Sequence, residues 1–359
     1  MEDQFRSRLE KIEAEIDKWL PEKPGPSWMD KVFTGVLPAG GSVPVRAELA
    51  ASLSLPGWDL VKRGGKRWRP LLMLLAAESL GGEDGGQAAL PLTPLVEFPH
   101  NASLIHDDIE DNADERRGKP AVHLIYGTDT AINAGSFLYF LPLACLSAWG
   151  DKNKIAPALG EKIWTVWGTH MRALHLGQAM DIFWHRDFLS LPELDEYDRM
   201  CRLKTGCLAR LGAVLGAYIG AARQQSASAN AVNIEDLVKT YGRAAEQLGV
   251  GFQILDDVKN LSTGVPGKKR GDDIVEGKKS LPVLLYLHRY PEKRDFAARC
   301  FKAARDAGTT APETEEIIAA LEGAGILKEA WEKGLGYIQE SKEAFAGQEL
   351  IRGLIDSLI

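Results

Sequence analysis

Three aspartates in segment 100–123 (HNASLIHDDIEDNADERRGKPAVH) have a spacing that suits cation binding. Asp107, Asp108 and Asp111 form a DDxxD pattern behind a run of helical periodicity. Because positions i and i+4 are neighbours on a helix, Asp107 and Asp111 are expected to project side by side. A calcium loop of the EF-hand type is excluded, because Asn112 occupies the position where that loop requires glycine. A lone DDxxD is also compatible with a solvated helix end.

A second acidic cluster favours a functional interpretation. In segment 246–260 (EQLGVGFQILDDVKN), Gln253, Asp256, Asp257 and Asn260 are spaced i, i+3, i+4 and i+7, which places them on one helical face. Paired carboxylates on otherwise apolar helices repel one another and resist removal from water, unless cations lie between them. Oxygen ligands without His or Cys suit Mg²⁺, which keeps several waters and shares its coordination sphere with substrate phosphates.

Basic residues accompany both acidic clusters. A carboxylate and a phosphate oxygen about 4 Å apart repel by roughly 4 kcal/mol at an effective dielectric constant near 20. Metal ions on one side of a diphosphate and a Lys/Arg fork on the other reverse that sign. Each basic run alone is typical of a solvated surface, but their position next to the acidic clusters favours a shared diphosphate site. The basic residues are Lys66, Arg67 and Arg69 in GGKRWRP, Arg116 and Arg117, and then Lys268, Lys269, Arg270 and Lys278.

The elements that carry these clusters are predicted to be α-helices. Strand-like alternation and Asn-Gly or Asp-Gly hairpins between apolar runs are not found, whereas helical periodicity is widespread. Examples are 58–80, 130–148 and 315–345, and the predicted breakers between helices are 21–28, 37–44, 81–87 and 262–273. Without a repeat or a long polar linker, the chain is expected to form a single all-α domain (1–359), preceded by a helical arm at about 1–20.

Composition narrows the class of protein. The 359 residues are 45% hydrophobic and 26% charged, which is an ordinary globular balance, and the net charge of −7 argues against nucleic acid as a partner. The four cysteines are too far apart for a zinc site and are expected to be reduced. The N-terminus lacks the apolar stretch of a signal peptide, and the apolar runs 71–77 and 212–222 are too short to span a membrane. We therefore expect no membrane span and a cytoplasmic location.

The motifs together resemble the trans-isoprenyl diphosphate synthase family, also called polyprenyl synthetases. The match runs from about Gly64 to Pro282 and includes, in the family's order, GGKRWRP, SLIHDDIED, ERRGKP, KTG (204–206), GFQILDD and DDIVEGKKSLP. The resemblance implies an all-α fold, a large helical bundle around a deep central cavity (the isoprenoid synthase type), usually a homodimer. It also implies that the two aspartate motifs face each other across that cavity.

The resemblance assigns roles residue by residue. Several Mg²⁺ ions, with Mn²⁺ as an alternative, would be bound by Asp107, Asp111 and Asp256, with support through water from Asp108 and Asp257. The diphosphate of isopentenyl diphosphate would be held by Lys66, Arg69, His100 and Arg117. The allylic diphosphate would be held by Arg116, Lys204, Lys269 and Lys278. The developing positive charge would lie beside Thr205 and Gln253.

The implied reaction is a magnesium-dependent, head-to-tail prenyl transfer. Charge drawn onto the leaving diphosphate allows the allylic C–O bond to ionise. The double bond of isopentenyl diphosphate then attacks the carbocation, and a proton is lost. No side chain has to act as a nucleophile, so electrostatic positioning is expected to supply most of the rate.

Three positions depart from the family's pattern, and one of them, Ser136, stands where Asp or Asn is common, with no consequence that we derive. Asn260 stands where many members have the last aspartate of the second motif. Because the first aspartate of that motif is the main ligand, we expect activity to survive this change. Pro99 stands where an apolar helix former is common, so we expect the helix to kink or to begin there.

Residues below the first aspartate motif are expected to set the product length. Ala102 and Ser103 are small where farnesyl-length enzymes commonly have an aromatic residue. Segments 130–140 (TAINAGSFLYF) and 173–184 (ALHLGQAMDIFW) resemble the eukaryotic type of geranylgeranyl diphosphate synthase. That resemblance implies that Tyr139, Phe140 and His175 close the tunnel, although core packing is an equal explanation for the two aromatic residues. The predicted product is geranylgeranyl diphosphate, followed by a longer polyprenyl chain and then farnesyl diphosphate.

Two other classes of protein remain as alternatives. A terpene cyclase shares a DDxxD but typically carries an Asn/Asp–Ser/Thr–Glu triad in place of the second cluster, and it has little need for GGKRWRP. A non-catalytic partner subunit tends to lose an aspartate cluster or the basic fork, and both are present here. Turnover by the purified chain alone would distinguish the last alternative.

Overall fold

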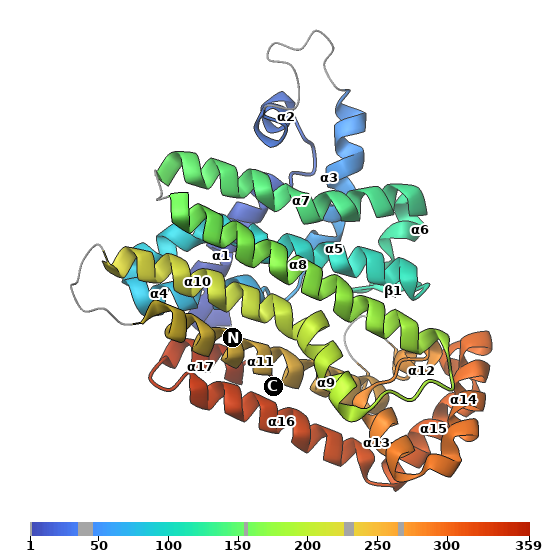
Figure 1. Ribbon diagram of the computed structural model, residues 1–359. Helices are drawn as coiled ribbons and strands as arrows, with labels where there is room; N and C mark the ends of the chain where they lie inside the picture. Colours follow the sequence, from blue (N-terminus) through green and yellow to red (C-terminus); the bar gives the residue numbers. More distant parts are fainter. Residues whose placement is uncertain (1, 35–45, 154–156, 226–232, 265–268) are drawn as a thin grey trace. The chain divides into compact units, whose positions relative to one another are not determined.

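A computed structural model describes residues 2–34, 46–153, 157–225, 233–264 and 269–359. The chain divides into two compact units, unit 1 (Met1–Gly168 and Leu211–Val238) and unit 2 (Thr169–Arg210 and Lys239–Ile359). Nearly every described element is a helix, which confirms the all-α prediction (Figure 1). The predicted breaker 37–44 and Lys268 lie outside the described residues.

Unit 1 consists of helices and one short ribbon. The predicted helical arm is α1 (Glu2–Trp19). The other helices are α2 (Pro26–Val32), α3 (Ala47–Lys62), α4 (Trp68–Ala89), η1 (Leu90–Leu92), α5 (Pro94–Glu110), α6 (Val122–Tyr126), α7 (Thr128–Asn153), the first part of α8 (Pro157–Arg186) and most of α10 (Cys207–Gln225). Because α5 begins at Pro94, Pro99 lies inside the helix and the predicted start at Pro99 is wrong.

Glycine allows two helices of unit 1 to approach closely. A Cβ atom on Gly216 of α10 would lie 2.2 Å from the carbonyl oxygen of Met73, and one on Gly220 would lie 2.4 Å from that of Ala77. Since α4 supplies both carbonyls, only hydrogen in place of a side chain permits this backbone contact. The contact fixes α4, whose first residues are the end of the GGKRWRP motif.

Two local breaks in unit 1 differ from the predicted helical runs. The run 58–80 is interrupted between α3 and α4, where Gly64, Gly65 and Arg67 have positive φ angles of 97°, 136° and 50°. After α5, Glu115–Arg116 (β1) and Lys119–Pro120 (β2) pair antiparallel, with Arg117 and Gly118 as the two loop residues. Both loop residues have positive φ, as a tight two-residue hairpin requires. The search for Asn-Gly and Asp-Gly turns did not detect this Arg-Gly hairpin.

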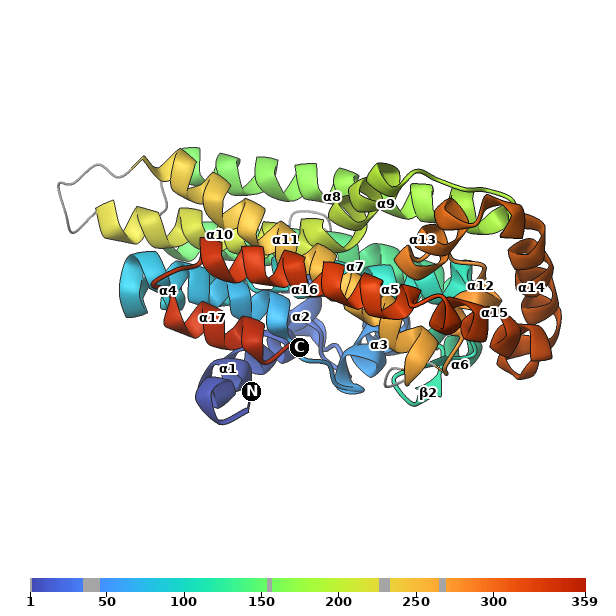
Figure 2. The same ribbon diagram turned by 90° about the horizontal axis from the view of Figure 1, so that it is seen from below.

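Unit 2 contains the remaining helices. They are the end of α8, α9 (Leu194–Cys201), η2 (Arg202–Gly206), most of α11 (Ile234–Ser262), α12 (Asp272–Glu276), α13 (Leu281–Arg289), η3 (Pro291–Lys293), α14 (Arg294–Ala307), η4 (Gly308–Thr310), α15 (Pro312–Gly323), α16 (Ile326–Ala344) and α17 (Glu349–Asp356). Figure 2 shows α16 beside α11, where a Cβ atom on Gly251 would lie 2.6 Å from the Ile338 side chain. The run 315–345 is therefore two helices, separated at Gly325, where φ is 71°.

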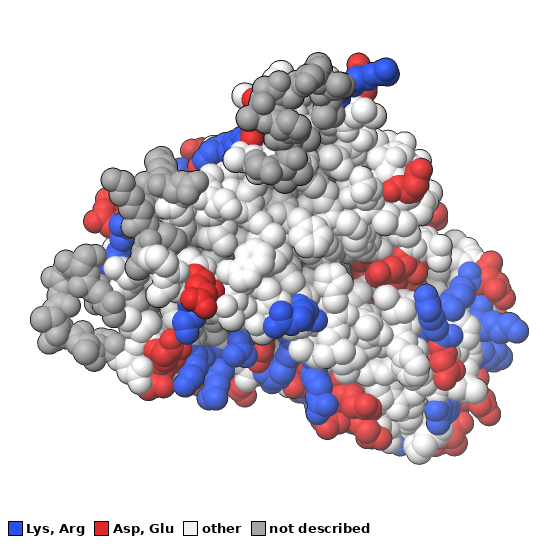
Figure 3. Space-filling view, turned by 45° about the horizontal axis from the view of Figure 1, so that its top comes forward, with Lys and Arg blue, Asp and Glu red and all other residues white. Residues whose placement is uncertain are grey.

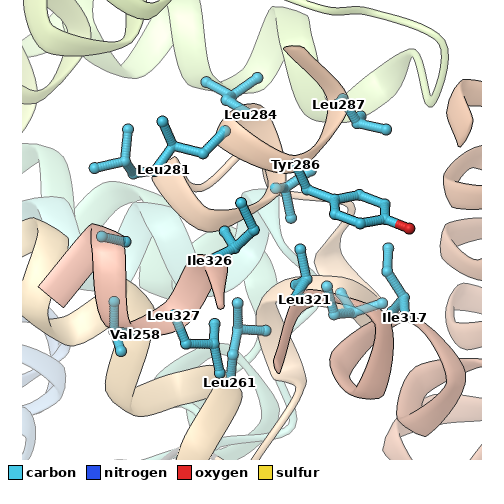
Figure 4. Packing of buried hydrophobic residues seen from close by; sticks show 14 of the residues in the cluster. Val258, Leu261, Leu281, Leu284, Tyr286, Leu287, Ile317, Leu321, Ile326 and Leu327 are labelled. Atoms are coloured by element: carbon cyan, nitrogen blue, oxygen red, sulfur yellow. The ribbon is translucent and has the colours of Figure 1, made fainter. Parts of the chain in front are cut away.

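The core of unit 2 lies next to the second acidic cluster. Val258 and Leu261 of α11 belong to one buried cluster with residues of α13, α15 and α16. Figure 4 shows Leu281 and Tyr286 of α13 and Ile326 of α16 pointing into this cluster. Burying such side chains contributes about 1.5–3 kcal/mol each. The apolar side of α11 is thus fixed by packing, and this orients the acidic side chains beside it on the same helix.

Two helical stretches among the described residues are long and apolar enough to cross a membrane by length and composition alone. They are Thr128–Gly150 and Leu194–Arg223, whose most apolar windows are 44% and 83% buried, respectively. The sequence criterion of unbroken apolar runs did not detect them, because small and polar residues interrupt both stretches. Core helices of globular proteins pass the same test, so this finding is weak evidence for a membrane span.

Candidate functional site

The first acidic cluster lies at the end of α5 and is tied to the β1–β2 hairpin. The Asp108 carboxylate is fully buried and accepts a hydrogen bond of 2.7 Å from Nε of Arg116. A terminal nitrogen of the same guanidinium contacts Asp108 and also donates to Asp107 over 3.5 Å. The hairpin therefore holds a cation directly against the aspartate pair.

Asp107 and Asp111 project from the last turn of α5. The helix ends at Glu110, and Asp111 is its C-terminal cap, with its backbone N–H donating to the Asp107 carbonyl over 2.9 Å. Both aspartates are only partly buried. Two adjacent hard oxygen donors that water can reach suit a divalent cation that completes its shell with water and phosphate oxygens.

Arg69 and His100 lie together beside the GGKRWRP turn. Arg69 is buried and its NH1 lies 3.4 Å from Nε2 of His100. Burial, together with the charges of Arg69, Arg117, Arg67 and Arg116, holds the pKa of His100 well below its usual range. The imidazole is consequently neutral at physiological pH and offers a hydrogen bond without adding charge.

Arg117 approaches the same turn from the hairpin. Its NH1 donates to the carbonyls of Gly64 (2.5 Å) and Leu60 (3.1 Å). Burial lowers the pKa of Arg117 to about 10, so the guanidinium remains charged at neutral pH. Lys66, on the turn itself, is exposed. The predicted isopentenyl diphosphate ligands Lys66, Arg69, His100 and Arg117 are all in unit 1.

The predicted length-determining residues have different environments. Ala102 is fully buried, and Ser103 is half-buried, with its hydroxyl donating to the His100 carbonyl over 2.8 Å. Tyr139 of α7 is 8% exposed, with its ring centroid 5.7 Å from that of His106, whereas Phe140 is 64% exposed. His175 of unit 2 is exposed. The roles of all five residues stay predictions.

The second acidic cluster is held by neutral donors. The Asp257 carboxylate accepts hydrogen bonds from the Tyr197 hydroxyl (2.7 Å), from Nε2 of Gln253 (2.8 Å) and from the backbone N–H of Leu281 (3.3 Å). Burial raises the pKa of Asp257 to about 6, against the effect of these donors, and the charge of Asp256 adds to the rise. Asp256 is only partly buried. One carboxylate is therefore fixed and the other is within reach of solvent.

A π-helical turn carries the two predicted catalytic residues of the KTG motif. The segment Arg202–Gly206 is the π-helix η2, a geometry that is frequent at functional sites. Nζ of Lys204 donates to Asp181 over 2.6 Å. The Thr205 hydroxyl donates to Oε1 of Gln253 over 2.7 Å. Thr205, Gln253 and Asp257 thus form one continuous hydrogen-bonded chain.

Asn260 has a structural contact that explains the departure from DDxxD. Its Oδ1 accepts from the backbone N–H of Asp273 (3.2 Å), and its carbonyl accepts from that of Gly271 (2.9 Å). The side chain is 2% exposed. A buried neutral amide positions the start of α12 without the cost of burying another charge. Lys269, which precedes α12, is exposed, and Lys278, which follows it, forms an ion pair with Glu276.

The sequence correctly predicted helices for the two aspartate clusters, but it did not identify several residues that contact them or the basic residues nearby. Asp181 and Tyr197 belong to unit 2, and Glu97 and Asn101, discussed below, belong to unit 1. Asp181 ends the GQAMD segment (177–181), six residues after His175. An acid within this helical segment could have identified Asp181 as a candidate partner of a lysine. Tyr197 is 60 residues from Asp257, so no local spacing links them.

Within the described residues, no three His, Cys, Asp or Glu side chains gather closely enough to hold a metal ion by themselves. The donor chemistry of each unit nevertheless fits a divalent cation that shares its ligands with a diphosphate, because Asp107 and Asp111 in unit 1, and Asp256 in unit 2, are partly buried oxygen donors.

Comparison with known proteins gives a consistent result. The family model described as "Polyprenyl synthetase" matches residues 51–320. The chain is 35% identical to a geranylgeranyl diphosphate synthase of Methanosarcina mazei over 79% of this chain and 80% of that one. It is 29% identical to a geranylfarnesyl diphosphate synthase of Aeropyrum pernix over 86% and 93%.

Solved structures agree with these relatives. A geranylgeranyl pyrophosphate synthetase of Pyrococcus horikoshii aligns with a TM-score of 0.78 and 26% identity, over 99% of this chain and 96% of that one. A polyprenyl synthase of Caulobacter crescentus, solved in complex with calcium and isoprenyl diphosphate, aligns with a TM-score of 0.75 and 25% identity, over 100% and 97%.

Proposed function

The chain belongs to the polyprenyl synthetase family as a trans-prenyl diphosphate synthase, and we propose that it condenses isopentenyl diphosphate with an allylic diphosphate to make geranylgeranyl diphosphate. The single observation that carries the proposed product is the 35% identity to a geranylgeranyl diphosphate synthase over about four-fifths of both chains. The buried Ala102 is compatible with it, because a small residue near the cluster leaves room for a long chain.

The basic residues of each unit are proposed to bind diphosphate oxygens. In unit 1, Lys66, Arg69, His100 and Arg117 would hold isopentenyl diphosphate. The allylic diphosphate would be bound by Arg116 of unit 1 and by Lys204, Lys269 and Lys278 of unit 2. In the structure Lys204 and Lys278 contact Asp181 and Glu276, respectively. A bound diphosphate would compete for these ammonium groups, which the carboxylates hold in place meanwhile.

The carboxylates Asp107, Asp111 and Asp256 are proposed to hold Mg²⁺ together with the allylic diphosphate. Bound there, the ion would supply Lewis-acid assistance to the departing diphosphate. The donor set fits this role, and a divalent cation with isoprenyl diphosphate is present in the Caulobacter relative. Asp108 and Asp257, which are buried and hydrogen-bonded, would fix the orientation of their neighbours.

Thr205 and Gln253 are proposed to face the developing allylic cation. The Thr205 hydroxyl gives its proton to Gln253, and Gln253 in turn donates to Asp257. With its proton directed at Gln253, the Thr205 oxygen presents lone pairs to its surroundings. A preorganised oxygen dipole of this kind stabilises positive charge without any rearrangement during the reaction.

The test is a product analysis. The purified chain is incubated with Mg²⁺, isopentenyl diphosphate and, in separate reactions, dimethylallyl, geranyl or farnesyl diphosphate, and the products are sized by mass spectrometry. A twenty-carbon product from each primer is expected. A fifteen-carbon product would refute the proposed chain length, and the absence of turnover would support a non-catalytic partner subunit.

A longer product is the second candidate. The relative from Aeropyrum pernix, which makes geranylfarnesyl diphosphate, matches over a larger share of this chain although at lower identity. A twenty-five-carbon product in the same assay would favour this candidate.

We also propose that the chain forms a homodimer. Ile132 and Phe140 of α7 are exposed apolar residues in unit 1, and Trp164, Leu176 and Phe183 are exposed along α8. Figure 3 shows a face whose middle carries few charged side chains. Large exposed apolar areas typically mark interaction surfaces. Light scattering should give a mass near twice 39.3 kDa, and Phe183→Glu should shift it toward the monomer.

A further inference from the structure

Glu97 is a buried carboxylate that contacts Arg67 and acts electrostatically on Arg117. It lies on α5, one turn before His100, and is 2% exposed. Its Oε1 accepts a hydrogen bond from NH1 of Arg67 (3.2 Å) and another from Nδ2 of Asn101 (2.9 Å). The proposed diphosphate ligands do not include Glu97, and a carboxylate would repel a diphosphate. Its position therefore calls for another explanation.

Arg67 is fully engaged by the protein. Its Nε donates to Glu13 of α1 (2.7 Å), and its two terminal nitrogens donate to the carbonyls of Gly64 (3.1 Å) and Val61 (2.6 Å) as well as to Glu97. Arg67 has a φ of 50°, a conformation that non-glycine residues adopt only when their surroundings enforce it. Four hydrogen bonds in three directions supply that enforcement and fix the turn that carries Lys66 and Arg69.

Asn101 extends the same network to the hairpin. Its Nδ2 donates to Glu97, and its Oδ1 accepts from NH1 of Arg117 over 3.4 Å. That NH1 also donates to Gly64, so the carbonyl of Gly64 is shared by Arg67 and Arg117. A Cβ atom on Gly65 would lie 2.7 Å from Arg67 and 3.1 Å from Arg117. One carboxylate thus connects the turn with the hairpin.

The arginines around this turn also need a nearby negative charge. Besides burial, the charges of Arg63, Arg67 and Arg116 lower the pKa of Arg117, and the negative charge of Glu97 is the largest influence that raises it. Without that charge, the guanidiniums would repel each other before any substrate arrives. An anion held beside them offsets part of this repulsion.

From these contacts we infer that Glu97, acting through Arg67 and Asn101, is a positioning residue for the isopentenyl diphosphate subsite. It holds the Gly64–Arg69 turn and Arg117 in the geometry that receives the diphosphate, without touching the substrate itself. The inference rests on the proposed function, because it concerns the subsite assigned there to isopentenyl diphosphate.

The test is Glu97→Gln, which keeps the shape and removes the charge. Isopentenyl diphosphate affinity, measured by titration calorimetry, should fall about tenfold or more, since charge-assisted hydrogen bonds of this kind are lost. The KM for isopentenyl diphosphate should rise equally, while kcat and the KM for the allylic substrate stay within about twofold. Glu78→Gln, which removes a carboxylate paired with Arg8 elsewhere in unit 1, is the matched control and should change none of these values.

Glu13→Gln keeps the inference falsifiable if Glu97→Gln fails to fold. Glu13 is partly exposed and contacts Arg67 from α1, so its loss should weaken isopentenyl diphosphate binding about threefold and spare allylic binding. A folded Glu97→Gln with unchanged affinity would overturn the inference, as would an equal loss for both substrates in Glu13→Gln. A wild-type chain that binds isopentenyl diphosphate but forms no product would refute the proposed function alone, because the titration needs no turnover.

Discussion

The two aspartate clusters share a sequence pattern but are stabilised differently. In unit 1, the buried Asp108 is paired with the guanidinium of Arg116. In unit 2, the corresponding Asp257 accepts hydrogen bonds from a tyrosine hydroxyl, a glutamine amide and a backbone N–H, with no cation among these donors. Its pKa accordingly rises to about 6 because burial outweighs the neutral donors. The DDxx pattern therefore does not determine whether the buried aspartate is stabilised by a cation or by neutral donors.

The cations of the two units differ in a parallel way. Unit 1 relies on arginines anchored to backbone carbonyls, as Arg117 is to Gly64. Unit 2 relies on lysines paired with carboxylates, as Lys204 is with Asp181. A guanidinium is planar and remains charged when buried, whereas an ammonium group is a flexible point charge whose pKa shifts readily. The arginine of unit 1 is thus held by backbone groups, whereas the lysine of unit 2 is held by a carboxylate with which the proposed diphosphate would compete.

The largest effect should come from removing the solvent-accessible acid of each cluster. Asp107→Ala and Asp256→Ala should each lower kcat by about a thousandfold or more, because metal-assisted departure of the diphosphate is lost. Steady-state kinetics at saturating Mg²⁺ would measure this, and far-ultraviolet circular dichroism should show unchanged helicity. Near-normal turnover by either variant would contradict its metal role and would separate the two clusters in function.

The comparison is sharpest when the buried acid of each cluster is made neutral. Asp108→Asn should lower the free energy of unfolding by about 2–3 kcal/mol, because the half-buried Arg116 loses its charge-assisted bonds to Asp108 and keeps the 3.5 Å contact with Asp107. Asp257→Asn should change it by only about 1 kcal/mol, since the amide oxygen can still accept from both Tyr197 and Leu281, no charge has to be buried, and only the bond from Gln253 is lost. Urea denaturation of both variants would compare them, and equal losses would contradict the distinction drawn here.

The helical fold and the location of both acidic clusters could be predicted because their signals are local. The i, i+4 spacing placed Asp107 and Asp111 on successive turns at the end of α5, and the apolar neighbours of Asp256 placed it on α11. Ordered motifs then identified the family. These inferences need only the period of a helix and the chemistry of the side chains.

The partners of these residues could not be predicted because they are distant in the sequence. Glu13 and Arg67 are 54 positions apart, and Tyr197 and Asp257 are 60 apart. The hairpin that carries Arg116 and Arg117 has only two residues per strand and a polar sequence, so apolar alternation could not reveal it. Helical periodicity also continued across GGKR, where two glycines and Arg67 adopt positive φ angles.

A smaller effect is expected from a lysine of unit 2 that lacks a carboxylate partner among the described residues. Lys279 is buried, with Nζ donating to the Gly277 carbonyl (3.1 Å) and lying 4.7 Å from the centre of the Phe301 ring. Burial lowers its pKa to about 8 from an ordinary 10.5. Lys279→Met should therefore raise the free energy of unfolding at pH 7 by about 1 kcal/mol or more, as removal of a buried charge does.

The pH dependence of this effect has a definite sign. Between about pH 8 and pH 10.5 the unfolded chain keeps the Lys279 proton that the folded chain has lost, so stability relative to Lys279→Met should rise with pH across this window. Below pH 8 both states are protonated and the difference should be constant. Urea midpoints of wild type and variant at matched pH values would measure it. A constant difference up to pH 10.5 would contradict the buried, pKa-shifted ammonium.

The smallest change in rate should come from α7, which supplies neither cluster. Tyr139 is buried against His106, while its neighbour Phe140 is 64% exposed, so we expect only Tyr139 to limit the length of the proposed product. Tyr139→Ala should lengthen the main product by one five-carbon unit with kcat within a few-fold of wild type, because the vacated side-chain volume is about that of a prenyl unit and no charged group is disturbed. Phe140→Ala is the matched control from the same helix and should leave the product length unchanged. Mass spectrometry would measure the product length of both variants. A longer product from Phe140→Ala alone would contradict this assignment. It would indicate that the exposed Phe140 ring limits the chain, which would require a second copy of the protein to cover that ring.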